Sequence, residues 1–296
     1  ILIVLILFAV VMTARWWHER FYQTQIMRFL PTPLLCYVPP TLLTTFGILP
    51  FKSQVYDWIA SYVLPACLIL ILMTTDIEGL KRIGRLSFIT IVGSTIAVLV
   101  SGTAVFFLFR EAIGPESGKA TATLAASWIG GTANQLAVKQ AIGFSDQLFT
   151  PLFIADITVV YLWMTILMIL SGRQHAIDRF LHADLGKLNV FKHSDKNSVK
   201  KSKSEKSSIQ SIFILLLIGF GVGNLAGWAG NRMPEIGMAV TQNTWVIIMV
   251  TTAGLLLSLT RYAQEKRAPA VTFGYFFFYF VLASTGAKAH LFAILR

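Results

Sequence analysis

Nine apolar segments, most of them close to the length that crosses a bilayer, alternate with shorter polar stretches along the chain. A lipid-exposed strand edge leaves backbone groups unpaired, so segments of about 20 apolar residues are expected to be helices. The pattern therefore predicts an all-α fold, a polytopic transmembrane helical bundle. The segments cover roughly residues 1–14, 33–49, 57–75, 86–109, 120–142, 149–170, 210–230, 243–260 and 270–288.

Two of these segments depart from the pattern of a plain span. The second contains three prolines, which predicts a kinked or broken helix. The fifth, 120–142, is the most polar segment and the richest in small residues, and it contains the pair Gly130-Gly131. Each glycine costs a helix about 1 kcal/mol relative to alanine, so a break is predicted there.

The longest polar stretch, 171–208, carries nine Lys or Arg against four Asp or Glu. By the positive-inside rule it is predicted to be a basic cytoplasmic linker. It divides the chain into a first transmembrane repeat, 1–170, and the start of a second, 209–296, which is incomplete. Apolar residues recur at helical spacing between 177 and 188, which fits either a helix on the membrane surface or a simple linker.

The basic loops also bear on how segment five enters the membrane. Loops 15–28, 81–85 and 261–267 are basic as well. All three loops lie on the same side of the membrane as the linker if segment five enters the membrane and returns to the same face. If it crosses fully, loop 81–85 lies opposite the linker, so the charge rule favours a re-entrant or strongly broken segment.

Composition supports a membrane protein and argues against several other classes. Of the 296 residues, 55% are hydrophobic and 13% are charged, whereas soluble domains carry about 25% charged residues. The net charge of +11 resides mainly between the apolar segments, which indicates no nucleic-acid partner. We find no phosphate loop, nucleophile motif or Cys/His metal cluster in the sequence, so neither an enzyme nor a bound cofactor is expected.

Segment five carries the strongest candidate site. Unwound helix ends at a break offer carbonyl groups to cations and N–H groups to anions. The polar side chains around the glycine pair are Ser127, Thr132, Asn134 and Gln135. The alternative is close helix packing, which explains Gly130 and Gly131 but not these polar side chains. Substrate binding is expected from Ser127, Gln135 and the backbone of the two glycines.

Asp156 lies several residues inside the sixth segment. An ionisable group at that depth costs at least about 2.5 kcal/mol on insertion scales, and it indicates a functional site by default. We expect it to bind the coupling ion, Na⁺ or H⁺, together with Asn134 and Thr132. The alternatives are a solvated position near the interface and an ion pair with Lys139.

Two stretches, 69–80 and 279–290, resemble each other. Both are apolar runs that end in a Ser/Thr pair and then become polar. Under the re-entrant topology the first ends inside and the second outside, as in the inverted repeats of secondary transporters. Asp76 and Lys288, at the polar ends of these stretches, are expected to form interfacial salt bridges.

The stretch from Ala126 to Val138 resembles the YxGGSxNxxAV signature of the bacterial membrane family called domain of unknown function 819. Residues 64–80, 155–157 and 274–287 also look like that family's pattern. In the signature itself, Trp128 replaces Tyr, Thr132 replaces Ser and Gln135 replaces an apolar residue, and the last change makes the site more polar.

This resemblance implies a carrier distantly related to cation:proton antiporters and to bile-acid and glutamate symporters. Such carriers have two inverted repeats and broken helices that meet at mid-membrane, and they are commonly homodimers. The resemblance also implies a multi-pass protein of the bacterial inner membrane. The family has a second Gly-Gly segment, which this sequence does not reach.

Together these features predict an ion-coupled secondary transporter, whose partners are the lipid bilayer and a small anionic solute such as an amino acid, a short peptide or a carboxylate. The alternative is a non-transporting membrane scaffold or an accessory subunit of a larger complex. A channel is less favoured, because no selectivity filter or ring of like charges is recognisable. The chain begins at Ile1 inside an apolar run, which indicates a fragment trimmed at both ends.

Overall fold

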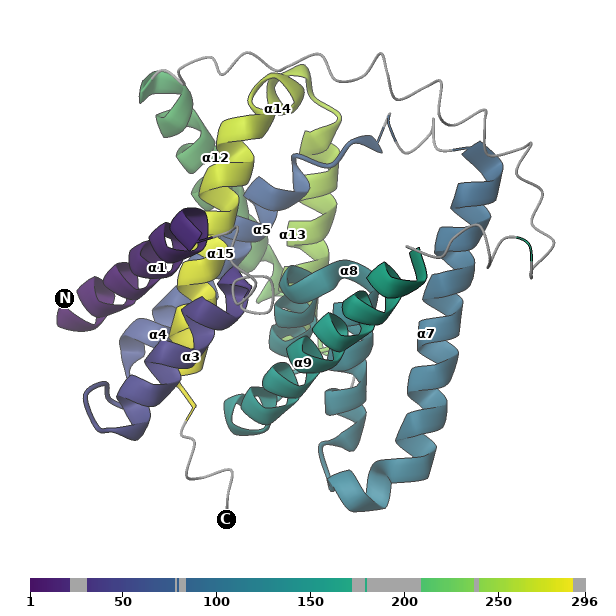
Figure 1. Cartoon of the computed structure of the whole chain (residues 1–296). Helices are drawn as coiled ribbons and strands as arrows, with labels where there is room; N and C mark the ends of the chain where they lie inside the picture. Colours follow the sequence, from purple (N-terminus) through teal and green to yellow (C-terminus); the bar gives the residue numbers. More distant parts are fainter. Residues whose placement is uncertain are drawn as a thin grey trace. The chain divides into compact units, whose positions relative to one another are not determined.

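The computed structural model describes residues 1–21, 31–77, 79, 84–171, 179, 209–236 and 240–289, and these are mostly helical (Figure 1). Each of the nine apolar segments contains a helix, which confirms the all-α polytopic bundle. The elements are α1 (Leu2–Phe21), α3 (Thr32–Thr45), α4 (Gln54–Trp58), the π-helical turn η1 (Ile59–Val63), α5 (Leu64–Leu72), α7 (Gly84–Ile113), α8 (Ser117–Ala141), α9 (Asp146–Ser171), α12 (Ile209–Gly230), α13 (Gln242–Ser258), α14 (Arg261–Glu265) and α15 (Arg267–Ala287).

The chain divides into two compact units. The larger consists of Ile1–Ile154 and Ile209–Arg296, and the smaller of Ala155–Ser208. The surface helix considered for residues 177–188 and the basic residues at 81–82 lie outside the described residues. The division of the chain into two repeats stays a prediction.

Helix α5 is the centre of the larger unit. Every residue from Leu64 to Leu70 is buried, so the helix is apolar on all sides. A helix without a polar face must be enclosed by other elements. Helices α12, α13 and α15 enclose α5, and all three pack extensively against it.

Glycines allow these three helices to approach α5 closely. A Cβ atom on Gly223 of α12 would lie 2.9 Å from the backbone nitrogen of Ala66, and one on Gly254 of α13 would lie 2.7 Å from Leu72 Cβ. A Cβ on Gly274 of α15 would lie 2.9 Å from a side chain of α5. Lipid tails are as apolar as leucine, so helices in a bilayer associate through such close packing rather than through the hydrophobic effect.

Threonines of α3 bind the last turn of α15. Thr41 Oγ1 donates a hydrogen bond to the carbonyl of Gly286, and Thr44 Oγ1 donates one to the carbonyl of Ala287, both at 2.9 Å. The last carbonyls of a helix have no partner within it. The two threonines therefore satisfy buried polar groups at the contact between α3 and α15.

Six helices of the described chain are long and apolar enough to cross a membrane. In α7, no residue of the apolar stretch Ser87–Glu111 is buried. The hydroxyls of Ser94 and Thr103 donate to carbonyls four residues earlier, so they need no water. An exposed apolar surface this large is suited to lipid, and it identifies a membrane protein.

Prolines affect the helices in two different ways. Helix α3 continues through Pro39 and Pro40 as a single element, so a broken second segment, one of the two predicted outcomes, is wrong. Near Pro65 the helix changes type, because the π-helical turn η1 ends just before α5 begins. The wider π turn lies where a regular turn would place the proline ring against a carbonyl.

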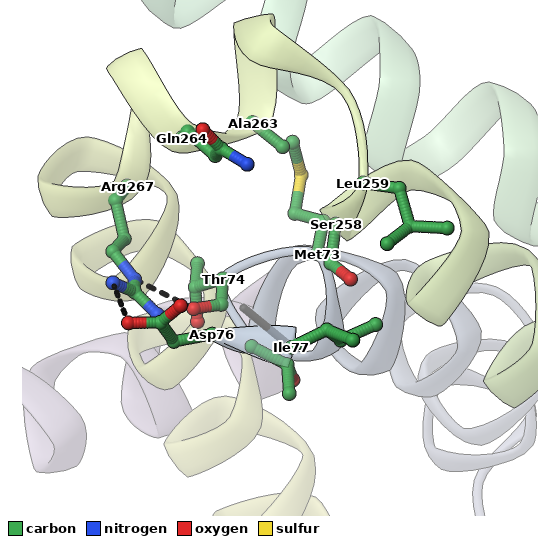
Figure 2. Close-up of a pocket in the computed structure, with 10 residues that line it drawn as sticks. Met73, Thr74, Asp76, Ile77, Ser258, Leu259, Ala263, Gln264 and Arg267 are labelled. Carbon is green, nitrogen blue, oxygen red and sulfur yellow. Dashed lines mark hydrogen bonds and ion pairs between the residues drawn. The ribbon is translucent and has the colours of Figure 1, made fainter. Parts of the chain in front are cut away.

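Helices α5 and α15 run antiparallel, and charge pairs hold the opposite ends of α15. At the end that we call the Arg267 face, Arg267 Nε donates to the carbonyl of Thr74 at 2.7 Å, and Arg267 Nη1 lies 3.6 Å from Asp76 Oδ2 (Figure 2). At the other end, the Lys288 face, Lys288 Nζ lies 2.8 Å from Asp57 Oδ1. Asp76 and Lys288 thus form ion pairs, as expected. The described parts of the two resembling stretches thus end at opposite faces, and the inverted repeat itself stays a prediction.

Replacing Gly223 by alanine tests the packing around α5. Gly223→Ala is expected to destabilise the detergent-solubilised protein by about 1–3 kcal/mol, because the new methyl group meets the backbone of α5. Gly221→Ala in the same helix is the control, since a Cβ there meets no atom within 4 Å. Thermal unfolding followed by fluorescence measures both variants, and equal melting temperatures would contradict the packing described here.

Candidate functional site

Helix α8 is interrupted at Gly131. The residue has φ 76° and ψ −174°, inside an otherwise helical run of 25 residues. This region of φ/ψ space is essentially restricted to glycine. The helix therefore consists of a first arm, 117–130, and a second arm, 132–141. The interruption falls within the glycine pair that the sequence singled out.

The two ends of α8 lie together. Lys119 Nζ, near the start of the first arm, donates to the carbonyl of Gly143 at 3.0 Å, just after the second arm. The backbone N–H of Ser145 donates to Glu116 Oε2 at 3.3 Å. The arms consequently form a hairpin, which we call the α8 hairpin, that starts and ends on the same face of the larger unit.

Charged groups stabilise the contact between the two ends of α8. Burial would raise the pKa of the Glu116 carboxyl, but the hydrogen bonds from Ser145 and the ammonium of Lys119 outweigh burial and lower the pKa. The Glu116 carboxylate is therefore charged at neutral pH, which strengthens its hydrogen bonds with Ser145 and Lys119.

Asn134 bridges the two arms at the interruption. Its Nδ2 donates to the carbonyl of Ala126 at 2.9 Å, from the second arm to the first. Gly130 leaves room for this contact, because a Cβ there would lie 2.8 Å from Asn134 Nδ2. With its nitrogen engaged in this way, Asn134 Oδ1 is the atom that could coordinate a cation.

The remaining residues predicted in segment five differ in their access. Gly130 and Gly131 are exposed at the tip of the hairpin, and Ser127 and Thr132 are partly buried within one helical turn of it. Gln135 is completely buried. The hairpin thus gathers most of the predicted residues at one tip and places Gln135 in the interior.

Asp156 belongs to the smaller unit. It lies near the middle of the candidate span Asp146–Met164 of α9, and it is 5% exposed. A buried carboxyl group therefore lies near the middle of an apolar helix. Lys139, which the sequence suggested as an alternative partner for Asp156, forms its ion pair with Asp146.

A cluster of charges beside the hairpin was not predicted. Lys139 in the second arm is buried, and besides its pair with Asp146 its ammonium lies 5.2 Å from the ring centroid of Phe149. Lys288 Nζ lies 3.9 Å from Asp146 Oδ2 and 2.8 Å from Asp57 Oδ1. Asp57 and Lys288 are 231 positions apart, so no local motif could have revealed this cluster.

The described residues contain no group of three or more His, Cys, Asp or Glu arranged to hold a metal ion. The tip itself carries carbonyl, hydroxyl and amide oxygens. These hard ligands suit Na⁺ rather than a transition metal.

Apolar helices with a lipid-facing surface, and a polar hairpin among them, define a multi-pass membrane protein. The chain belongs to the family described as Protein of unknown function (DUF819), whose model matches residues 5–296. This confirms the family resemblance of the α8 signature.

One curated protein illustrates the family relationship. The chain is 34% identical over 114 residues to Uncharacterized membrane protein YjcL of Bacillus subtilis (strain 168). The match covers 38% of this chain and 28% of that protein, so it spans little more than a quarter of the relative's length. No solved structure matches the chain.

Substitution of residue 131 tests the backbone conformation at the tip. Gly131→Ala is expected to destabilise the protein by about 1–3 kcal/mol, because alanine is strained at this φ and ψ. Gly93→Ala in α7 is the control, since neither position has a neighbour within 4 Å of an added Cβ but only Gly131 has a positive φ. Unfolding by denaturant in mild detergent measures the difference. Equal stabilities of the two variants would contradict the interruption at Gly131.

The charge cluster predicts unequal effects for its two carboxylates. Asp146→Asn leaves the buried ammonium of Lys139 without its charged partner and is expected to cost about 3 kcal/mol. Asp57 is 74% exposed, so Asp57→Asn is expected to cost less than about 1 kcal/mol. The same unfolding assay applies. A loss for Asp146→Asn as small as that for Asp57→Asn would show that the Lys139 charge is not buried.

Proposed function

We propose that this protein is an ion-coupled secondary transporter of a small, carboxylate-bearing solute, with the α8 hairpin as its central site. The single observation that carries the proposal is that α8 is interrupted at Gly131 and that its two ends are hydrogen-bonded to each other. Irregular backbone at membrane depth is tolerated only where protein covers it or where it lines a water-filled cavity. A hairpin of this kind supports a path for solute.

The length of the hairpin supports a site near the middle of the membrane. A helical arm from residue 117 to residue 130 is about 20 Å long at a rise of ~1.5 Å per residue. The hydrocarbon core is about 30 Å thick. An arm of this length that starts at one face ends inside the membrane, and the second arm returns from there. This is the re-entrant topology that the basic loops favoured.

The tip presents groups of both polarities. The first arm ends in carbonyl groups and the second begins with N–H groups, and the two meet at Gly131. In our proposal the carbonyls, the Thr132 hydroxyl and Asn134 Oδ1 bind the coupling cation. The N–H groups and the Ser127 hydroxyl bind the solute carboxylate, as helix N-termini bind anions. Gln135 supports the site from the interior.

Asp156 is proposed to carry the coupling charge. A carboxylate buried in an apolar span is costly while it is charged, and binding of Na⁺ or H⁺ neutralises it. Because neutralisation changes the cost of burial, ion binding would favour one conformation of the carrier over the other. The similarity to a Bacillus subtilis membrane protein supports the bacterial cytoplasmic membrane as the location.

Transport is tested in proteoliposomes that carry an imposed Na⁺ or H⁺ gradient. The protein is expected to accumulate label from radiolabelled amino-acid, dipeptide and carboxylate mixtures, and Asp156→Asn is expected to lose the gradient-driven part. Glu235→Gln, which neutralises an exposed loop carboxylate, is the control and should transport normally.

Two results would contradict this proposal. Normal gradient-driven accumulation by Asp156→Asn would refute the coupling role of Asp156. Accumulation of none of the three mixtures by the unaltered protein, under either gradient, would favour a scaffold or accessory subunit.

A further inference from the structure

The Lys288 face contains an open pocket of about 470 Å³, which we call the Lys288 pocket. Sites for small molecules typically have volumes of about 300–1,000 Å³. The pocket at the Arg267 face (Figure 2) has about 20 Å³, which leaves room for little more than a water molecule. A groove of about 300 Å³ between α7 and α8 has no charged residue in its lining. Of the three, only the Lys288 pocket combines charge with room for a solute.

Opposite charges alternate along one wall of the Lys288 pocket. Lys288 Nζ lies between Asp57 Oδ1, at 2.8 Å, and Asp146 Oδ2, at 3.9 Å. Behind this wall, Lys139 pairs with Asp146 and compensates its charge. Lys288 and Asp57 then remain as an ion pair that faces the pocket, and Lys52 adds a second, exposed cation to the lining. Asp57 is 74% exposed, so water reaches this pair and a ligand can compete for it.

The rest of the lining suits an organic solute rather than a bare ion. Phe51 contributes aromatic surface. Tyr56 also borders the pocket, but it is fully buried and its hydroxyl donates to the carbonyl of Pro50 at 3.0 Å, so it shapes the pocket rather than offering a polar group. Ser53 and Gln147 add uncharged polar groups. A few placed charges in a partly aromatic pocket are typical of sites for small molecules.

We propose that the Lys288 pocket binds a zwitterionic amino acid or a short peptide. Lys288 takes the solute carboxylate and Asp57 takes the solute ammonium, so one ion pair of the protein is exchanged for two with the solute. A solute with a carboxylate alone would take Lys288 from Asp57 without supplying an ammonium in its place. An amine alone would take Asp57 from Lys288 without supplying a carboxylate. This mismatch is the basis of selectivity.

The position of the pocket relates it to the α8 hairpin. Asp146 and Gln147 line the pocket at the start of α9, a few residues after the hairpin ends. The pocket is therefore a second site, at the membrane face from which the hairpin starts, where a solute is held before or after it occupies the tip. This inference rests on the proposed transport function, and it narrows the substrate class from anionic solutes to zwitterions.

Equilibrium binding to the detergent-solubilised full chain tests the proposal. The probes are the standard L-amino acids and alanylalanine, followed by analogues of the best-bound probe that lack its α-amino or its α-carboxyl group. The complete zwitterion is expected to bind, and each analogue about tenfold or more weakly, because each loses one charged contact. Lys288→Gln and Asp57→Asn are expected to weaken binding of the zwitterion to a similar extent. Arg232→Gln, which removes an exposed cation outside the pocket, should bind like the unaltered protein.

The proposal is overturned if no probe binds, if an analogue binds as well as the zwitterion, or if both pocket variants bind normally.

Failure of the pocket proposal can be distinguished from failure of the transport proposal. Gradient-driven uptake with normal binding by Lys288→Gln and Asp57→Asn would overturn the pocket and leave the transporter. Zwitterion binding that depends on Lys288 and Asp57, without uptake by the unaltered protein, would support the pocket and refute transport.

Discussion

The close approach of glycines to helix α5 is the contact on which the larger unit depends. Gly223, Gly254 and Gly274 each bring a different helix to a distance at which a methyl group would meet atoms of α5. Inside a membrane the hydrophobic effect does not drive helices together, so contacts of this kind must supply much of the association. The apolar α5, which is buried from Leu64 to Leu70, makes this possible, because it presents side chains and backbone to neighbours on every side.

In a helical bundle packed in this way, polar groups occupy only a few positions among the described residues. The threonines of α3 satisfy the last carbonyls of α15, and ion pairs occupy the two ends of that helix. The α8 hairpin is the exception, because it brings an interruption and several polar side chains into the bundle. Retaining such groups costs stability, and this cost is the physical reason for assigning function to the hairpin rather than to the apolar spans.

Much of this arrangement could be predicted from the sequence, because it follows from local composition. Apolar runs of membrane length predicted the helices, and Gly130-Gly131 marked the position at which α8 leaves helical geometry. Three features could not be predicted in this way. Helix α3 continues through Pro39 and Pro40, Asn134 uses its nitrogen to join the two arms, and Lys139 and Lys288 meet Asp146 and Asp57. The last two depend on residues that only the folded chain brings together.

The return of α8 to the face from which it starts is tested most directly by labelling single introduced cysteines with a membrane-impermeant maleimide. Both native cysteines are buried, which keeps the background low. Pro115→Cys precedes the hairpin, Gln147→Cys follows it, and Glu265→Cys lies in α14, near the Arg267 face; all three positions are exposed. Labelling of intact cells and of inverted vesicles should place 115 and 147 on one side of the membrane and 265 on the other. Labelling of 115 and 147 from opposite sides would mean that α8 crosses the membrane, and would contradict the hairpin.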